Sequence, residues 1–156
     1  MKTELILVGK TNDKHFRTGI DDYCQRIGHY MPFSITVIPE LKNTKSLSFQ
    51  QQKEREGELI LAKLQSSDHV VLLDEHGKDF RSVEFARWIE QKNASVRRLV
   101  FVIGGPYGFS EAVYSRANEK ISLSKMTFSH QMVRLVFVEQ IYRACTIIKG
   151  EPYHHE

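Results

Sequence analysis

Short apolar runs recur along the chain and are bounded by turn-forming or polar residues. Uninterrupted runs at residues 5–8, 69–73 and 99–103 have the length and composition of strands buried on both faces of a sheet. Residues 33–38 form a β-rich run between two prolines, and residues 121–123 form a last, short run. The pattern therefore predicts five strands.

Between these runs, apolar residues recur at helical spacing. In residues 14–27, the aromatic and isoleucine side chains follow one another at steps of four, three and four, which places one apolar stripe along a helix. Ser48, Ser110 and Ser129 each precede such a segment and are predicted to cap a helix. The predicted helices span residues 14–27, 49–64, 83–91, 111–118 and 130–149.

The order of these elements predicts the fold class. Strands that alternate with helices of this length need right-handed crossovers, which favour an α/β fold: a mainly parallel sheet flanked by helices on both faces. The apolar fraction of 41% and the charged fraction of 26% are ordinary for a globular protein. No boundary is visible, so residues 1–156 are predicted to form a single domain.

The last predicted helix has no continuous polar face. Its apolar side chains project all around the axis, whereas a helix on the surface of a monomer keeps one polar face. We therefore expect it to be covered by its own sheet and by a second subunit of a homodimer. The apolar residues are Met132, Val133, Leu135, Val136, Phe137, Val138, Ile141, Ile147 and Ile148.

Charge, cysteines and hydropathy narrow the class of protein. The formal charge of +3 permits a nucleic-acid partner without requiring one. Cys24 and Cys145 lie far apart in apolar segments and are predicted to be reduced, packed thiols. The first apolar run is too short for a signal peptide, and no later run reaches membrane-spanning length. We expect a cytoplasmic protein without a membrane partner, and without a metal site because metal-ligand spacing is missing.

Three segments that follow predicted strands carry candidate chemistry: residues 72–78, 103–108 and 123–130. Ligands of open α/β sheets bind outside the carboxyl ends of the strands, so these segments can converge on one site. Taken singly, each has a plainer interpretation: the Gly-Gly-Pro of the second suits a tight turn, and the acidic residues of the first suit a solvated loop. Glycine-rich dinucleotide and Walker motifs are missing, which argues against those cofactors.

Together, the three segments and the tail resemble one family. The blocks FVIGGPYGFS, LSKMTFSHQMVRLVFVEQIYRA and the terminal PYHH stand in the order and spacing of the ribosomal RNA large subunit methyltransferase H family, a minimal group of the SPOUT class. The resemblance runs along essentially the whole chain. It implies a C-terminal trefoil knot, a rare exception to unknotted folds, whose loops bind the methyl donor S-adenosylmethionine. It also implies a homodimer that methylates N3 of a pseudouridine in the large-subunit (23S) RNA of assembled ribosomes.

By position, the resemblance implies a donor site lined by residues from all three segments. Apolar walls and backbone hydrogen bonds suit an adenine ring, and Gly104 would let the chain approach the ligand closely. The implied residues are Leu73, Gly104, Leu123, Ser124, Lys125, Met126, Thr127 and Phe128.

Catalytic candidates lie towards the C-terminus. Methyl transfer from a sulfonium needs alignment and removal of the N3 proton, so cations or a base near the acceptor ring are expected. The candidates are Arg134, Arg143, Tyr153 and His154. The resemblance implies that the tail of one subunit reaches the donor pocket of the other, which favours Tyr153 and His154. For the two arginines, an ion pair with Glu139 or another helix neighbour is supported almost as well.

The chain departs from the family pattern at His155, where a basic residue is common, which leaves phosphate contact by the tail open. Surface cations that could form a basic rim are Lys10, Lys14, Arg97, Arg98 and Lys149. Because such residues usually only solvate a surface, we predict that the protein recognises a folded ribosomal surface by shape, with few phosphate contacts.

Two alternative functions stay open at this point. One is a non-catalytic ribosome-binding assembly factor with the same fold, against which the intact glycine and LSKMTF blocks argue. The other is an α/β enzyme that uses a different nucleotide cofactor, against which the missing phosphate-binding motif argues.

Overall fold

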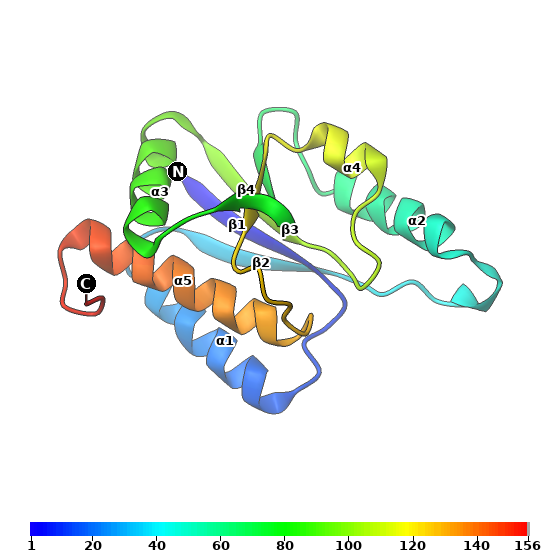
Figure 1. The fold of residues 1–156 in the computed structure, drawn as a ribbon, viewed down its shortest axis with the longest axis horizontal. Coiled ribbons are helices and arrows are strands. Elements are labelled where there is room, and N and C mark those ends of the chain that lie inside the picture. The colour runs from blue at the N-terminus through cyan, green and yellow to red at the C-terminus, as the bar shows by residue number, and fades with distance from the viewer. Residues whose placement is uncertain (156) are drawn as a thin grey trace.

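Five parallel strands form one sheet, in the order β2-β1-β4-β3-β5 (Figure 1). The computed structural model describes residues 1–155. The strands are β1 (Lys2–Val8), β2 (Phe33–Ile38), β3 (His69–Asp79), β4 (Arg98–Ile103) and β5 (Glu119–Ser122). Each lies where an apolar run predicted it, so the predicted parallel sheet is confirmed.

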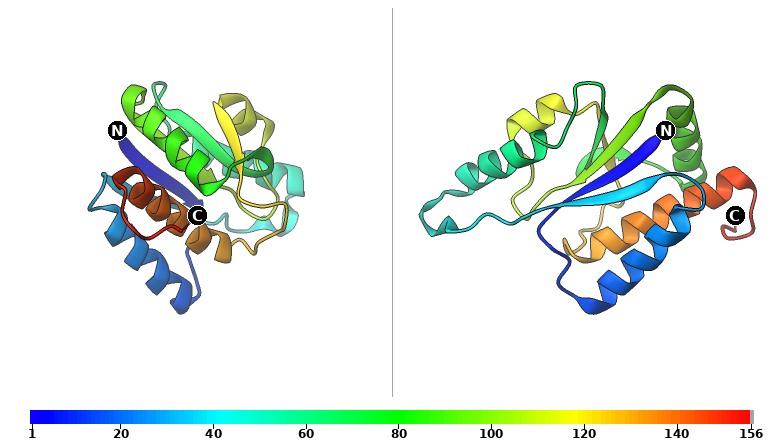
Figure 2. Two further views of the ribbon diagram at one scale, coloured as in Figure 1. Left: turned by 60° about the vertical axis from the view of Figure 1, so that its left-hand side comes forward. Right: turned by 180° about the vertical axis from the view of Figure 1, so that it is seen from behind.

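Helices cover both faces of this sheet, as the sequence predicts. Helices α1, α3 and α5 pack on one face, and α2 and α4 pack on the other (Figures 1 and 2). They are α1 (Lys14–Ile27), α2 (Phe49–Leu61), α3 (Ser82–Ser95), α4 (Glu111–Arg116) and α5 (Met132–Lys149), and the 3-10 helix η1 (Thr44–Ser46) precedes α2. Within residues 1–155, none of these helices combines the length and the apolar character that a bilayer crossing needs.

Strand β1 shows why the sheet needs uninterrupted apolar runs. Leu5 and Leu7 pack into the core beneath α1, α3 and α5, whereas Ile6 and Val8 pack into the core beneath α2 and α4. Neighbouring residues of a strand point to opposite faces, so a strand covered on both sides is apolar at successive positions. Each such side chain stabilises the fold by about 2 kcal/mol when fully buried.

Two of the three predicted helix caps, Ser48 and Ser110, are present, whereas α5 is capped at Gln131 and not at Ser129. The Ser48 hydroxyl accepts from the Gln51 amide at 3.1 Å, and the Gln51 side chain accepts from the Ser48 amide at 2.9 Å, which completes a capping box. The Ser110 hydroxyl caps α4. Ser129 accepts from the amide of Met132 at 3.1 Å, but α5 begins at Met132, two residues later than predicted.

Strand β3 differs from its prediction in a way that matters for the site. The sequence predicts a strand that ends at residue 73, followed by a loop. In the structure, Leu73 and Lys78 both lie opposite Ile121 of β5, so the residues between them bulge out and the strand then resumes. A Cβ atom at Gly77 would lie 2.6 Å from the backbone of Ile121, so only glycine fits where the strand returns to β5.

Contacts within the same chain explain part of why α5 is apolar all around its axis. Phe137, Val138 and Ile141 are fully buried, and the helix packs against α1 and α3. Met132 and Ile148, at its two ends, remain exposed. The homodimer and the trefoil knot stay predictions.

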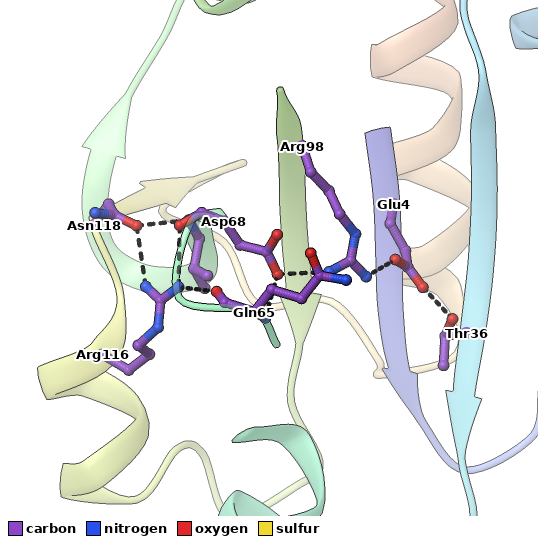
Figure 3. Close-up of polar contacts among 8 residues, drawn as sticks. Glu4, Thr36, Gln65, Asp68, Arg98, Arg116 and Asn118 are labelled. Carbon is purple, nitrogen blue, oxygen red and sulfur yellow. Dashed lines mark hydrogen bonds and ion pairs between the residues drawn. The ribbon is translucent and has the colours of Figure 1, made fainter. Parts of the chain in front are cut away.

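A polar network closes the amino ends of the strands (Figure 3). Arg98, the first residue of β4, pairs with Glu4 of β1 and donates to Asp68, just before β3, at 2.5 Å. Thr36 of β2 donates to the same Glu4 carboxylate. The sequence suggests Arg98 as one cation of a basic rim on the surface. In the structure, Arg98 instead links β4 to β1 and to the residue just before β3.

A second arginine extends this network towards β5. Arg116 of α4 donates to the carbonyls of Gln65 and Asp68 at 2.8 and 3.1 Å. The side chain of Asn118 accepts from the Val70 amide at 2.8 Å. The two arginines thus bind backbone and carboxylate oxygens of the segment just before β3 and tie it to α4 and β4.

Candidate functional site

A pocket of about 530 Å³ lies at the carboxyl ends of β3, β4 and β5, opposite the polar network. It is lined by residues from the three segments that the sequence singles out: 73–76, 103–106 with 108–109, and 122–124 with 126–130. Tyr114 of α4 and Val133 of α5 complete the wall. Segments distant in the chain converge here, as the position of ligand sites in open α/β sheets predicts.

The wall of the pocket is largely apolar, with one bare stretch of backbone. Leu73, Leu123 and Val133 supply aliphatic surface, and Met126 is 79% exposed at the mouth. At Gly104, a Cβ atom would lie 2.9 Å from the ring of Phe109, so a side chain there would collide with the wall. The missing side chain leaves room for a ligand against the backbone.

Hydrogen bonds between residues two positions apart hold the segment that follows β5. The Ser122 hydroxyl donates to the Ser124 carbonyl at 3.1 Å, and the Ser124 hydroxyl accepts from the Met126 amide at 3.0 Å. These bonds fix a tight turn whose remaining backbone groups face the pocket region. Seven of the eight residues predicted to bind the donor line the pocket, and the eighth, Lys125, is exposed and outside its lining.

One polar corner breaks the apolar wall. The Tyr114 hydroxyl donates to Asp74, whose other carboxylate oxygen accepts from the His76 amide at 2.8 Å. Burial alone would raise the pKa of Asp74, but the hydrogen bonds from Tyr114 and His76 lower it below its usual range. Burial and the Asp74 bond raise the pKa of Tyr114 to about 12. The corner therefore holds a carboxylate and a neutral phenol at neutral pH.

The glycine turn after β4 is tied to α2. Glu56 accepts from the Gly105 amide at 3.1 Å. Burial raises the pKa of Glu56, and the nearby Glu40 adds to this, while the bond from Gly105 opposes it. Sequence reasoning missed Glu56 and Tyr114, since a lone acid or tyrosine on an amphipathic helix carries no motif.

Three of the four catalytic candidates form a cluster around Glu139, in the middle of α5. Glu139 Oε1 accepts from Arg143 at 2.7 Å and from the Tyr153 hydroxyl at 2.8 Å. Arg143 Nη1 lies 3.0 Å from His154 Nδ1. The ion pair between Arg143 and Glu139, the alternative interpretation of this arginine, is thus present together with the contact to the tail.

The environment of Tyr153 defines what its hydroxyl can do. Its ring packs edge-on against Tyr142, with centroids 4.8 Å apart, beneath the Arg143 guanidinium at 4.9 Å. Burial, together with hydrogen bonds to Tyr23 and Glu139, raises the pKa of Tyr153 well above its ordinary value. Tyr153 therefore stays protonated at neutral pH and acts as a hydrogen-bond donor rather than as a base.

The fourth candidate, Arg134, is separate from this cluster. It is 1% exposed and donates to the carbonyls of Val8 and Gly9 at 2.7 and 2.9 Å, and to the Thr11 hydroxyl at 3.0 Å. Burial lowers its pKa. Neither an ion pair with Glu139 nor a contact with the tail cluster is formed; Arg134 instead anchors the carboxyl end of β1 to α5.

The residues present fit a nucleoside-type methyl donor. The cavity volume is within the range of small-molecule sites, and the wall combines aliphatic side chains, exposed glycine backbone and a few polar groups. Among residues 1–155, no group of three or more His, Cys, Asp or Glu side chains is arranged to hold a metal ion.

A parallel α/β sheet with a ligand pocket at its carboxyl edge defines a broad class of ligand-binding and transferase folds. The comparisons with known proteins narrow this class. The family model described as "Predicted SPOUT methyltransferase" matches residues 1–154. The chain belongs to the SPOUT methyltransferase family.

Similar proteins match along their full length. A Bacteroides fragilis protein is 67% identical over 157 residues, covering 100% of both chains. Proteins from Phocaeicola vulgatus and Flavobacterium johnsoniae are 65% and 57% identical, again over 100% of both chains. Each of the three is named "Ribosomal RNA large subunit methyltransferase H".

Proposed function

We propose that this protein transfers the methyl group of S-adenosylmethionine to N3 of a pseudouridine in large-subunit ribosomal RNA, within assembled ribosomes. The observation that carries the proposal is the meeting of residues 73, 104 and 122–128 in one apolar pocket, in a chain of the SPOUT family. The names of the full-length relatives support the RNA substrate. An enzyme of ribosomes would work in the cytoplasm.

The donor would lie in the pocket described above. Leu73 and Leu123 would hold the adenine between aliphatic surfaces, and the backbone from Gly104 and from residues 122–128 would supply hydrogen bonds. Bound S-adenosylmethionine would supply an electrophilic methyl group on its sulfonium. The task left to the protein is to align the acceptor nitrogen and to remove its proton.

The tail cluster would perform that second task. Glu139 accepts from both the Arg143 guanidinium of α5 and the Tyr153 hydroxyl of the tail, so one carboxylate fixes a cation and a hydroxyl from two segments side by side. A fixed cation stabilises negative charge that develops on the acceptor ring as N3 loses its proton. His154 lies 3.0 Å from Arg143 and has a ring nitrogen that can accept a proton, which makes it the general-base candidate of this cluster.

The position of the cluster supports a homodimer. Val133, near the amino end of α5, lines the pocket, whereas the tail folds back onto Glu139 in the middle of the same helix. Among the described residues, none of the tail residues 151–155 lines the pocket of its own chain. A second subunit that packs on α5 would bring its own tail to the pocket.

The direct test is transfer of labelled methyl from S-adenosylmethionine to ribosomes that lack the modification, followed by mapping of the modified base. We expect label at N3 of a single pseudouridine in the large-subunit RNA. Donor binding without label in the ribosomes would show that the enzyme acts on another substrate, whereas a protein that does not bind the donor would be the non-catalytic assembly factor. Absence of donor binding in calorimetry would reject the proposal.

A truncation tests the tail separately. Removal of residues 153–156 is expected to leave donor affinity unchanged and to abolish methylation, while His155→Ala, at an exposed position, serves as the control. His154→Ala is expected to lower kcat, and an effect confined to KM would reassign His154 from catalysis to docking. Full turnover by the truncated protein would contradict a catalytic tail.

A further inference from the structure

Two aromatic rings stack on the surface, next to the pocket. Phe49, the first residue of α2, and Tyr107, in the glycine turn after β4, have ring centroids 4.4 Å apart and planes inclined by 20°. They are 65% and 43% exposed, so most of this paired surface stays in water. Large apolar side chains are usually buried, and this pair therefore needs an explanation.

The packing of α2 does not require Phe49. The helix is docked through Gly57 and Ile60, which are buried against α4 and the sheet. Phe49 belongs to neither buried core, and the capping box of Ser48 and Gln51 already fixes the start of the helix. Its exposed ring thus contributes little to the fold.

The aromatic pair is nevertheless held rigidly against the pocket. Pro106 and Gly108, the two neighbours of Tyr107, line the pocket, whereas Tyr107 itself is outside the lining and stacks on α2. Seven residues after Phe49, two turns along the same face of α2, Glu56 binds the Gly105 amide at 3.1 Å. Two contacts therefore join α2 to the turn that forms the pocket wall.

We infer that the Phe49–Tyr107 pair is a stacking platform for an unpaired base of the ribosomal RNA, beside the base that enters the pocket. The inference rests on the proposed function. Proteins recognise single-stranded RNA mainly by stacking splayed bases on aromatic side chains, and a preformed, rigid pair loses little entropy on binding. Lys42 and Lys45, both exposed in the loop before Phe49, supply positive charge for the adjoining phosphates.

The modest charge of the chain agrees with this mode of binding. With a formal charge of only +3, the protein gains little affinity from counterion release alone. Stacking on an aromatic face itself releases no counterions and accepts any base. A small protein can thus hold RNA beside its active site without a separate RNA-binding domain.

The test is steady-state methylation of ribosomes by Phe49→Ala and Tyr107→Ala. Each variant is expected to raise KM for ribosomes on the order of tenfold, with kcat and the Kd for S-adenosylmethionine unchanged. Phe49→Trp and Tyr107→Phe keep an aromatic face and should retain the wild-type KM. Leu59→Ala removes another exposed apolar side chain of α2, 40% exposed, and is the matched control.

Four outcomes would overturn the platform. An unchanged KM in both alanine variants would do so, as would a Phe49→Leu variant that matches Phe49→Trp, because leucine is apolar but cannot stack. A loss of dimer mass by light scattering in the alanine variants would assign the pair to a subunit contact instead. Photo-crosslinking from position 49 should label RNA; crosslinks to a ribosomal protein alone would reject an RNA partner.

A different set of results would show that the proposed function itself is wrong. If wild-type protein binds S-adenosylmethionine but never labels ribosomes, the choice of substrate is wrong, whatever the variants do. If wild-type protein labels ribosomes and the alanine variants do so with the same KM, only the platform is wrong.

Discussion

The two ends of the sheet are built from different kinds of residue. At the amino ends, Arg98 bridges Glu4 and Asp68, and the network fills the space between the strands (Figure 3). At the carboxyl ends, glycines and short turns leave a pocket of about 530 Å³. Ion pairs link the strands at the amino ends, while a cavity that can hold a ligand remains at the carboxyl ends. The molecule thus places stability and proposed chemistry at opposite ends of the same strands.

This comparison predicts that changes at the amino end affect folding and changes in the pocket affect binding. The largest effect is expected for Arg98→Met. It leaves the Glu4 and Asp68 carboxylates without their cation, at side-chain exposures of only 10% and 0%. The free energy of unfolding at pH 7 should fall by about 3 kcal/mol, the loss usual for a broken buried pair. Urea unfolding measures it, and kcat at 25 °C should be unchanged.

The same variant has a signature in pH. Burial would raise the pKa of Glu4, but the bonds from Thr36 and Arg98 lower it below its ordinary 4.5. A lowered pKa in the folded state gives stability that is present above pH 4.5 and is lost as the pH falls through the folded value. Without Arg98 the effect of burial dominates, so acid unfolding should begin at a higher pH. An unchanged acid midpoint would remove Glu4 from the stabilising network.

Gly77→Ala tests the bulge of β3, where residues 73–76 line the pocket and the strand then returns to β5. The added Cβ would meet the backbone of Ile121 and Lys120 at 2.6 Å, and backbone cannot move aside as a flexible side chain can. We expect a loss of about 2 kcal/mol in unfolding free energy, within the range for overpacking, together with weaker donor binding. Gly108→Ala cannot serve as the control, because Gly108 has a φ of +81°, a backbone conformation that residues with a side chain rarely adopt. Unaltered melting of Gly77→Ala would show that the bulge is not tightly held.

Gly104→Val sharpens the pocket side of the comparison. Its side chain would collide with the ring of Phe109, which lines the pocket and also packs in the core beneath α2 and α4, so the wall of the donor site would have to shift. Affinity for S-adenosylmethionine should fall about 30-fold, equivalent to about 2 kcal/mol. Calorimetry measures the affinity, and circular dichroism checks the fold. A folded variant with wild-type affinity would place the donor elsewhere.

The smallest effect is expected for Tyr114→Phe. It removes the hydrogen bond that lowers the pKa of Asp74 but keeps the aromatic ring. We expect donor binding to weaken about fivefold, equivalent to about 1 kcal/mol, because the polar corner of the pocket wall loses the bond that holds it. The melting temperature should stay close to that of the wild type. A larger loss in stability than in donor affinity would assign the bond to the fold rather than to the pocket.

Local pattern predicted most of the fold. Strands such as β1 carry apolar residues at successive positions, and Ser48 with Gln51 marks the start of α2 within three residues of chain. The bulge of β3 was not visible, because it depends on how Gly77 meets Ile121, 44 positions further along the chain. Contacts between residues so far apart in the sequence produce no periodic pattern from which they could be predicted.

The candidate site was predicted in part, for the same reason. The resemblance and the position of the strand ends brought Leu73, Gly104 and Met126 together correctly. The catalytic role of Arg134 stays a prediction, and its anchoring contact was not visible, since a charged residue on a helix carries no sign that it will bind the Val8 carbonyl 126 residues away. The Phe49–Tyr107 pair was unexpected because its partners come from segments that look unrelated along the chain.

A crystal structure with bound S-adenosylmethionine tests the central claim most directly. The account predicts the ligand against Leu73, Gly104 and Met126, at the carboxyl ends of β3, β4 and β5. A ligand bound at any other surface, with this pocket filled only by water, would contradict it.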